Sequence, residues 1–221
     1  MTLERDSARL EDPGAQLLDA ISTRWARYGR VALIVVGVAA AVAVGTILVL
    51  RSRAAQEDQA AGKLAEANLF FWQGLYDRSL PTARQVAEQW PSTPSGADAR
   101  RVAGDDLFWL GRFKESAAEY RLYLEKRKTG LTADAVRRSL AYALESDHQF
   151  KDAAPFYEGL VGRFDRESSA EFLLAAARCY RLMNQPKEAD LRLKRLLDEY
   201  GETSYANRAR IQRAELAAAP R

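Results

Sequence analysis

Residues 31–50 form an apolar run, VALIVVGVAAAVAVGTILVL, that contains no charged side chain. A helix of this length rises about 30 Å, roughly the thickness of the hydrocarbon core of a bilayer. The apolar region of a cleaved signal peptide is shorter, about 7 to 15 residues, and small residues follow it. Here Arg51-Ser52-Arg53 follows the run, so the sequence predicts one uncleaved transmembrane helix, with its flanks at residues 24–53.

Aromatic rings and cations flank the run, as they do where a helix meets lipid headgroups. The expected membrane-interface anchors are Arg24, Trp25, Arg27, Tyr28, Arg30, Arg51 and Arg53. Basic residues are equally frequent on the two sides, so the positive-inside rule barely decides the orientation, and long polar domains translocate largely regardless of charge. We expect the N-terminus inside and the C-terminal domain outside.

Three small residues spaced by four, Gly37, Ala41 and Gly45, share one face of the expected membrane helix. Such a face lets a second transmembrane helix approach closely, and it also arises by chance in spans rich in alanine and glycine. A helix that packs on a neighbour and a helix that faces only lipid are both compatible with the pattern.

The N-terminal tail of residues 1–23 precedes the membrane segment and carries charges of both signs. Pro13-Gly14 is expected to interrupt it. Three apolar residues lie at helical spacing after this break: Leu17, Leu18 and Ile21. The tail is compatible with a short helix at the membrane interface.

The composition argues against several function classes. A net charge of +3 without a basic stripe does not suit a nucleic-acid-binding protein. Cys179 is the only cysteine and His148 the only histidine, which excludes an intrachain disulfide, a Cys/His metal site and a Ser-His-Asp triad. No phosphate-binding loop or other catalytic motif is present. We therefore predict a protein that is not an enzyme and holds no cofactor or metal.

The remaining polar groups have ordinary structural interpretations. His148 is expected in a solvated turn, and Cys179 in the core of a helix pair. The neighbouring carboxylates of Asp105-Asp106 and of Asp198-Glu199 diverge by about 100° on a helix, so we expect them on solvated faces.

Four similar segments repeat with a period of roughly 36 residues. They align on the residue after a short polar turn: Tyr76, Phe113, Phe150 and Pro186. Each has an apolar-patterned helix, the turn, and a second helix with small or apolar residues at i, i+4 and i+7. In the last three segments these residues are Ser116, Tyr120 and Tyr123; Ala153, Tyr157 and Leu160; and Ala189, Leu193 and Leu196. The pattern predicts an all-α fold of about four helix pairs.

This pattern resembles the tetratricopeptide repeat (TPR) family, whose signature is W-x2-L-G-x2-Y…A-x3-F…P over about 34 residues. The residues that carry the resemblance are Ala103, Gly104, Leu107, Phe113 and Tyr120; Leu140, Ala141, Leu144, Phe150, Ala153 and Tyr157; and Ala176, Ala177, Tyr180, Ala189 and Leu193. Ser116 stands where the family has alanine, and the first repeat, with Ser79 and Ala83, matches least. The resemblance implies a TPR-like solenoid within residues 54–221, with repeats at 58–91, 97–130, 134–167 and 170–201 and a capping helix at 203–217.

A TPR-like solenoid implies a groove lined by the first helix of each repeat, where protein partners bind. Helical phase places these candidate residues in the groove or on its rim: Phe71, Trp72, Arg101, Asp105, Phe108, Trp109, Arg138, Tyr142, Glu145, Arg178 and Arg181. Adjacent helical residues point about 100° apart, so one ring of each Phe-Trp doublet is expected to be buried. The Lys/Asn clamp with which some TPR proteins bind a C-terminal carboxylate is not recognisable.

The tail, the membrane helix and the TPR-like domain together resemble bacterial ancillary subunits of the Sec translocon and envelope-complex assembly factors. The resemblance implies a single-pass inner-membrane protein with a periplasmic solenoid. One hypothesis is a non-catalytic scaffold or accessory subunit of a secretory, respiratory or photosynthetic membrane complex, which contacts lipid and partner subunits. The alternative is a translocon-associated chaperone that binds newly exported polypeptides through Trp72, Phe108 or Trp109.

Overall fold

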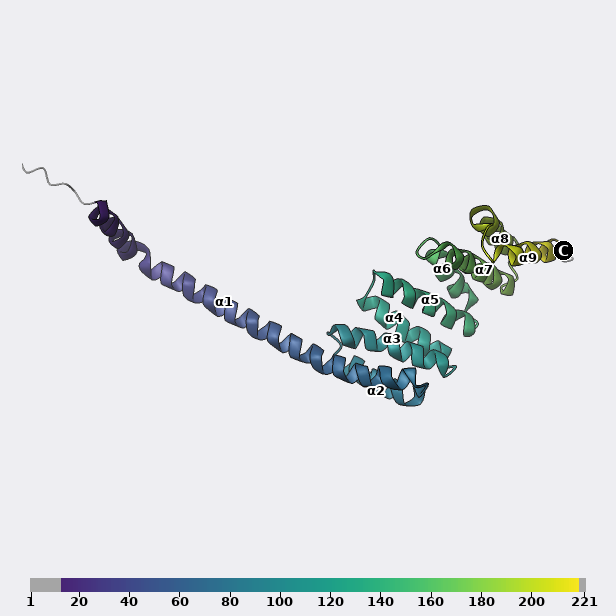
Figure 1. Cartoon of the computed structure of the whole chain (residues 1–221), viewed down its shortest axis with the longest axis horizontal. Coiled ribbons are helices and arrows are strands. Elements are labelled where there is room, and N and C mark those ends of the chain that lie inside the picture. The colour runs from purple at the N-terminus through teal and green to yellow at the C-terminus, as the bar shows by residue number, and fades with distance from the viewer. Residues whose placement is uncertain (1–12, 219–221) are drawn as a thin grey trace, which may run out of the picture. The chain divides into compact units, whose positions relative to one another are not determined.

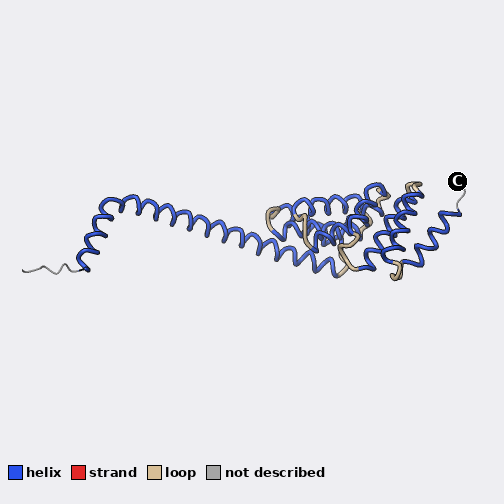
Figure 2. The backbone as a smooth tube through the Cα atoms, turned by 90° about the horizontal axis from the view of Figure 1, so that it is seen from above, coloured by secondary structure: helices blue, strands red, loops and turns tan. Residues whose placement is uncertain are grey.

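The structure is a computed structural model that describes residues 13–218. These residues form nine helices and no strand (Figure 2), which confirms the expectation of an all-α fold. The chain divides into two compact units, residues 1–54 and 55–221, which are described separately. Residues 1–12 of the predicted tail lie outside the described residues.

Helix α1 (Pro13–Trp72) contains the whole apolar run and continues into the second unit. Pro13 and Gly14, where a break was expected, are the first described residues of this helix, and the fixed φ of proline suits the first helical turn. Every side chain from 31 to 50 is exposed. Among the described helices, α1 is the one long and apolar enough to cross a membrane.

The second unit is a row of consecutively packed helices (Figure 1). After the end of α1 it contains α2 (Tyr76–Gln89), α3 (Pro94–Trp109), α4 (Phe113–Lys126), α5 (Leu131–Ser146), α6 (Phe150–Leu160), α7 (Arg166–Leu182), α8 (Pro186–Tyr200) and α9 (Ala206–Ala218). The four alignment residues Tyr76, Phe113, Phe150 and Pro186 are the first residues of α2, α4, α6 and α8. The turn inside each repeat therefore lies where the aromatic pattern placed it.

The first helices of the repeats begin earlier than the alignment suggested. Helix α3 begins at Pro94 rather than 97, and Thr93 caps it by accepting a hydrogen bond from Gly96 N at 2.9 Å. Pro94 is the first residue of α3, a position that proline commonly occupies. Helix α7 begins at Arg166 rather than 170, where Asp165 accepts from Ser168 N at 2.7 Å. These helix starts are determined by local capping residues, whose positions the repeat period does not predict.

Small residues allow the two helices of a repeat to approach closely. The Ser116 hydroxyl donates to the Gly104 carbonyl at 2.8 Å, and Ser79 makes the same contact with the Ala67 carbonyl at 2.9 Å. A Cβ atom on Gly104 would lie 2.6 Å from the Tyr120 ring, so only glycine fits there. Serine is accommodated in place of the family's alanine because its hydroxyl finds a backbone acceptor.

Two glutamates bond in the same way to a serine that lies further along the second unit. Glu57 of α1 accepts hydrogen bonds from the Ser95 amide at 3.1 Å and from its hydroxyl at 2.7 Å. Glu167 of α7 accepts from the Ser204 amide at 3.2 Å and from its hydroxyl at 3.0 Å, just before α9. The carboxylates satisfy amides at or near the N-terminus of the following helix.

The prediction of a solvated Asp106 was wrong: its exposed fraction is 0%. Neither carboxyl oxygen of Asp106 has a hydrogen-bond partner within the described part of the chain. Burial raises the pKa of Asp106 to about 7, the nearby Ser79 hydroxyl lowers it and the Asp105 carboxylate raises it. The helical phase of α3 did not predict this burial, because α2, α4 and α5 all contact α3.

Asp105, also expected on a solvated face, is half-buried, whereas the expectations for Asp198, Glu199, His148 and Cys179 agree with the structure. Asp198 and Glu199 are exposed, and His148 is exposed in the α5–α6 turn with φ 60°. Cys179 is buried, and burial raises the pKa of its thiol to about 12. A thiol that stays protonated at neutral pH is a poor nucleophile, so Cys179 is a core residue.

Candidate functional site

The small-residue face of the membrane segment is open in the structure. Gly37, Ala41 and Gly45 are exposed, and a Cβ atom on either glycine would meet nothing within 4 Å. This face has room for a close neighbour, and its packing role stays a prediction.

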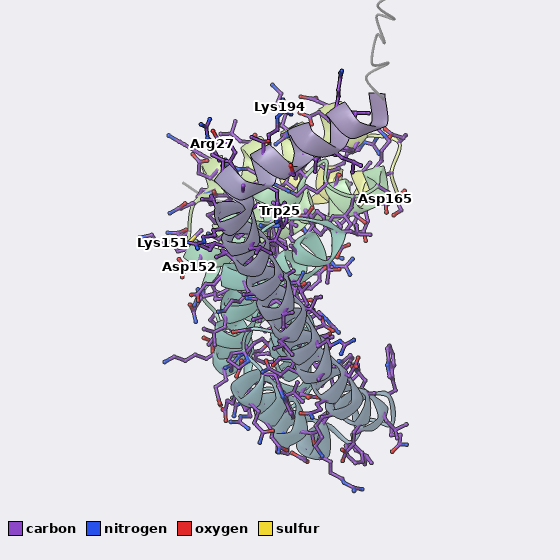
Figure 3. The ribbon with its side chains drawn as sticks, turned by 90° about the vertical axis from the view of Figure 1, so that its left-hand side faces the viewer. Trp25, Arg27, Lys151, Asp152, Asp165 and Lys194 are labelled. Carbon is purple, nitrogen blue, oxygen red and sulfur yellow. The ribbon has the colours of Figure 1, made fainter. Side chains whose placement is uncertain are left out.

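The membrane-interface anchors are also exposed, and Figure 3 labels Trp25 and Arg27 on α1. The Trp25 ring covers Gly29, where an added Cβ atom would lie 3.3 Å from the indole. The ring therefore lies along its own helix over the glycine one turn later. Its expected role at lipid headgroups stays a prediction.

Several predicted groove charges are bound to one another within the solenoid. Arg101 Nε donates to Asp98 at 2.8 Å, and its NH1 group donates to Asp105 at 2.9 Å. The Tyr120 hydroxyl of α4 donates to the other Asp105 oxygen at 2.7 Å. Burial raises the pKa of Asp105, and the bonds from Tyr120 and Arg101 oppose that rise. Two carboxylates share one guanidinium, so this group keeps a net negative charge.

A second network joins α5, α6 and α7. Glu145 accepts a hydrogen bond from the Tyr157 hydroxyl at 2.7 Å and two from the Arg178 guanidinium at 2.5 and 2.8 Å. Burial and the Glu145 carboxylate raise the pKa of Tyr157, so the phenol stays protonated. Glu145 and Arg178 therefore act as a tie between repeats.

Two further predicted groove cations lie in other contacts. The Arg138 guanidinium carbon lies 5.5 Å from the centre of the Phe164 ring. Arg181 is exposed and pairs with Glu215 of the capping helix α9 at 3.3 Å. The structure does not bring these cations together at one site.

The aromatic doublets belong to a continuous row of rings at the turns of the first two repeats. We call this row the aromatic ladder, and in spatial order it consists of Trp72, Phe71, Tyr76, Trp109, Phe108 and Phe113. Neighbouring ring centres lie 5.3 to 6.4 Å apart, and Tyr76 stacks on Trp109 with an interplanar angle of 7°. Such pairs are favourable geometries for aromatic rings.

The ladder exposes its tryptophans and shields its phenylalanines. Trp72 is 81% exposed and Trp109 is 62% exposed, whereas Phe71 and Phe108 are half-buried. Large rings exposed side by side with half-buried ones on a folded domain are typical of a binding surface. The sequence analysis did not include Tyr76 and Phe113 among the candidate groove residues, although their place directly after each turn puts them beside the doublets.

A cavity of about 120 Å³, the α3–α5 pocket, opens between two first helices. Its walls are Asp105, Phe108, Trp109, Tyr120, Ser139 and Tyr142. Four of these were candidate groove residues from the sequence, whereas Tyr120 and Ser139 were not. The Tyr142 hydroxyl donates to Glu171 of α7 at 2.8 Å, which holds its ring in place. Within residues 13–218, no set of three His, Cys, Asp or Glu side chains could hold a metal ion.

Comparison with known proteins supports the fold class. No protein-family model and no curated protein matches the chain. It is similar to a tetratricopeptide repeat protein from Parabacteroides merdae, with 12% identity, a TM-score of 0.61, and coverage of 72% of this chain and 60% of that one. It is also similar to MamA from Desulfovibrio magneticus, with 15% identity, a TM-score of 0.56, and coverage of 72% of this chain and 90% of that one. The second unit thus has a TPR-like α-solenoid fold.

Proposed function

We propose that this protein is a non-catalytic scaffold or accessory subunit, anchored by one membrane helix, that helps to assemble or stabilise a larger membrane protein complex. The N-terminus lies in the cytoplasm and the solenoid in the periplasm. One observation carries the proposal: a single chain combines an exposed apolar span at 31–50 with a TPR-like solenoid that bears the exposed aromatic ladder.

The membrane helix is the first contact with the complex. Because Gly37, Ala41 and Gly45 leave open space along one face, the backbone of a partner helix can approach closely there. Without a strong hydrophobic driving force between helices in lipid, such close packing is a main source of affinity.

The solenoid surface is the second contact. Its network charges, such as Glu145 and Arg178, are paired internally, whereas Trp72 and Trp109 are exposed. Large rings that are exposed in the free protein gain most from burial in an interface. The ladder is therefore the part of the solenoid that we expect partner subunits to cover.

The test is purification of the native full-length protein from its own membranes in mild detergent, followed by mass spectrometry. The paired change Gly37→Leu and Gly45→Leu adds bulk to the small-residue face. The matched control, Ala39→Leu and Ala43→Leu, adds two leucines about 160° away on the same helix. Recovery of a stoichiometric set of membrane subunits, lost in the first variant and kept in the control, supports the scaffold. Equal recovery with both variants argues against the helix-packing role.

The exposed tryptophans favour one alternative, a translocon-associated chaperone for exported polypeptides. A chaperone needs an apolar surface that accepts many sequences, and Trp72 and Trp109 offer one. The same purification separates the two functions. A translocase recovered with many substoichiometric secreted proteins would replace the scaffold by the chaperone.

A further inference from the structure

The α3–α5 pocket combines aromatic walls with a single carboxylate. Rings of Phe108, Trp109 and Tyr142 line it, and Asp105 is the only charged residue among its walls. Tyr120, which is almost fully buried, is also part of the wall. This is a defined small site within the larger ladder surface.

Both phenols in the pocket wall donate hydrogen bonds to carboxylates. The Tyr120 hydroxyl donates to Asp105, and the Tyr142 hydroxyl donates to Glu171. Each phenol has therefore committed its proton to a carboxylate. Besides the Ser139 hydroxyl, the pocket presents ring surface and carboxylate oxygen, both of which attract positive charge.

The nearby cations do not neutralise the site. Arg101 pairs with Asp105 but also with Asp98, so the three side chains together carry one excess negative charge. Arg138, one helical turn before Tyr142, lies over the Phe164 ring rather than in the pocket wall. The charge of Arg138 acts on the Tyr142 phenol, but Asp105 is the charged side chain that an anionic ligand would meet in the pocket wall.

We propose that the α3–α5 pocket binds the side chain of a lysine or arginine from a partner polypeptide. The methylene stem of that side chain packs on Phe108 and Trp109, and its cationic head reaches Asp105. A cation also restores to Asp105 part of the solvation that partial burial removes, whereas an apolar side chain would remove more. The inference rests on the proposed function in one respect, that the solenoid binds polypeptides.

Because of the position of Trp109, a partner segment bound at the pocket would contact the protein through more than one side chain. Trp109 belongs both to the pocket and to the ladder, where it stacks on Tyr76. A segment whose basic side chain enters the pocket therefore passes the exposed rings as well. The preferred partner segment has a basic residue with apolar neighbours.

The experiment uses the full-length protein in nanodiscs of zwitterionic lipid, which do not attract cations by net charge. The probes are capped pentapeptides with Ala-Ala-X-Ala-Ala sequence, where X is lysine, arginine, norleucine or glutamate. Peptide binding is measured by saturation-transfer NMR titration. We expect the lysine and arginine peptides to bind about tenfold more tightly than the norleucine peptide, and the glutamate peptide to bind most weakly.

Matched variants assign the effect to the pocket. Asp105→Asn should weaken lysine-peptide binding about tenfold, whereas Asp98→Asn, which removes the excess charge but leaves the Asp105 carboxylate in the pocket wall, should weaken it only about threefold. Because Asp105 also holds Tyr120, its variant could unfold. Trp109→Leu, at an exposed ring, and Ser139→Leu, which fills the pocket, provide independent tests, with circular dichroism as the folding control.

Norleucine binding as tight as lysine binding would overturn the inference, as would equal effects of Asp98→Asn and Asp105→Asn or unchanged binding in folded Trp109→Leu and Ser139→Leu. The titration contains no membrane complex. Its failure therefore leaves a positive co-purification result intact, and a failed co-purification leaves the ligand preference of the pocket intact.

Discussion

The first two repeats and the third repeat differ at the same two positions of their first helices. The first repeat has Phe71-Trp72 and the second has Phe108-Trp109, whereas the third has Glu145-Ser146 one repeat later. All three first helices end within one residue of these positions, at Trp72, Trp109 and Ser146. The same turn therefore forms whether these two positions hold aromatic or polar residues.

This difference distinguishes residues that stabilise the helix packing from residues that form an exposed surface. In the third repeat, Glu145 accepts hydrogen bonds from Tyr157 and Arg178 and ties neighbouring helices together. In the first two repeats the equivalent rings join the aromatic ladder, whose tryptophans are largely exposed. The helix pair does not need rings there, which supports the proposal that the ladder binds partners.

The largest expected effect tests this separation directly. Tyr157→Ala removes a fully buried ring and should lower the free energy of unfolding by about 3 to 5 kcal/mol. Trp109→Ala removes an exposed ring and should cost less than about 1.5 kcal/mol, the range of its stacking contacts. Urea denaturation of the full-length variants, followed by circular dichroism, measures both. Equal losses would make the ladder a structural element and break the comparison.

Acidification should stabilise the N-terminal repeats through Asp106. Its pKa is about 7 in the folded chain and near its ordinary value of 3.8 in the unfolded chain. The folded state therefore holds the proton more tightly, and its advantage is fully present below pH 3.8 and is lost as pH rises towards 7.

The difference in the free energy of unfolding between the wild type and Asp106→Asn separates the contribution of Asp106 from the contributions of other carboxylates. Lowering the pH from 8 to 5 should favour the wild type over the variant by roughly 2 kcal/mol, measured by urea denaturation at each pH. Parallel pH profiles of the two proteins would show that Asp106 is solvated in the native state.

A smaller effect should distinguish the inter-repeat tie from an exposed ion pair. A double-mutant cycle of Glu145→Ala and Arg178→Ala should give a coupling free energy of about 1 kcal/mol, because Glu145 is half-buried and doubly bonded to the guanidinium. The same cycle for Arg181 and Glu215, both exposed, should give less than about 0.5 kcal/mol. Similar coupling free energies for the two pairs would show that the Glu145–Arg178 pair stabilises the solenoid no more than an exposed ion pair does.

The smallest expected effect concerns the serine that replaces alanine in the second repeat. Ser116→Ala removes the hydrogen bond to the Gly104 carbonyl and should lower the free energy of unfolding by about 0.5 to 1 kcal/mol. Ser92→Ala, at an exposed residue between helices, is the control and should be nearly neutral. A stabilised Ser116→Ala variant would show that alanine packs better there than serine.

Much of the fold could be predicted from the sequence because its signals are local. The apolar run at 31–50 and the marks at Tyr76, Phe113, Phe150 and Pro186 each reflect a helix or a turn within a few residues. The starts of the first helices were placed less well, since Thr93 and Asp165 act through single capping bonds that a repeat period does not reveal.

By itself, the sequence determined an all-α chain with repeated helix pairs and one apolar span, because helical period and segment length are properties of neighbouring residues. Only the tertiary structure decided that Asp106 is buried, that Tyr76 joins the doublets in one ladder, and that Asp105, Tyr120 and Tyr142 meet at one pocket. These features depend on which faces of different helices pack together, and the pattern of any one helix does not contain that information.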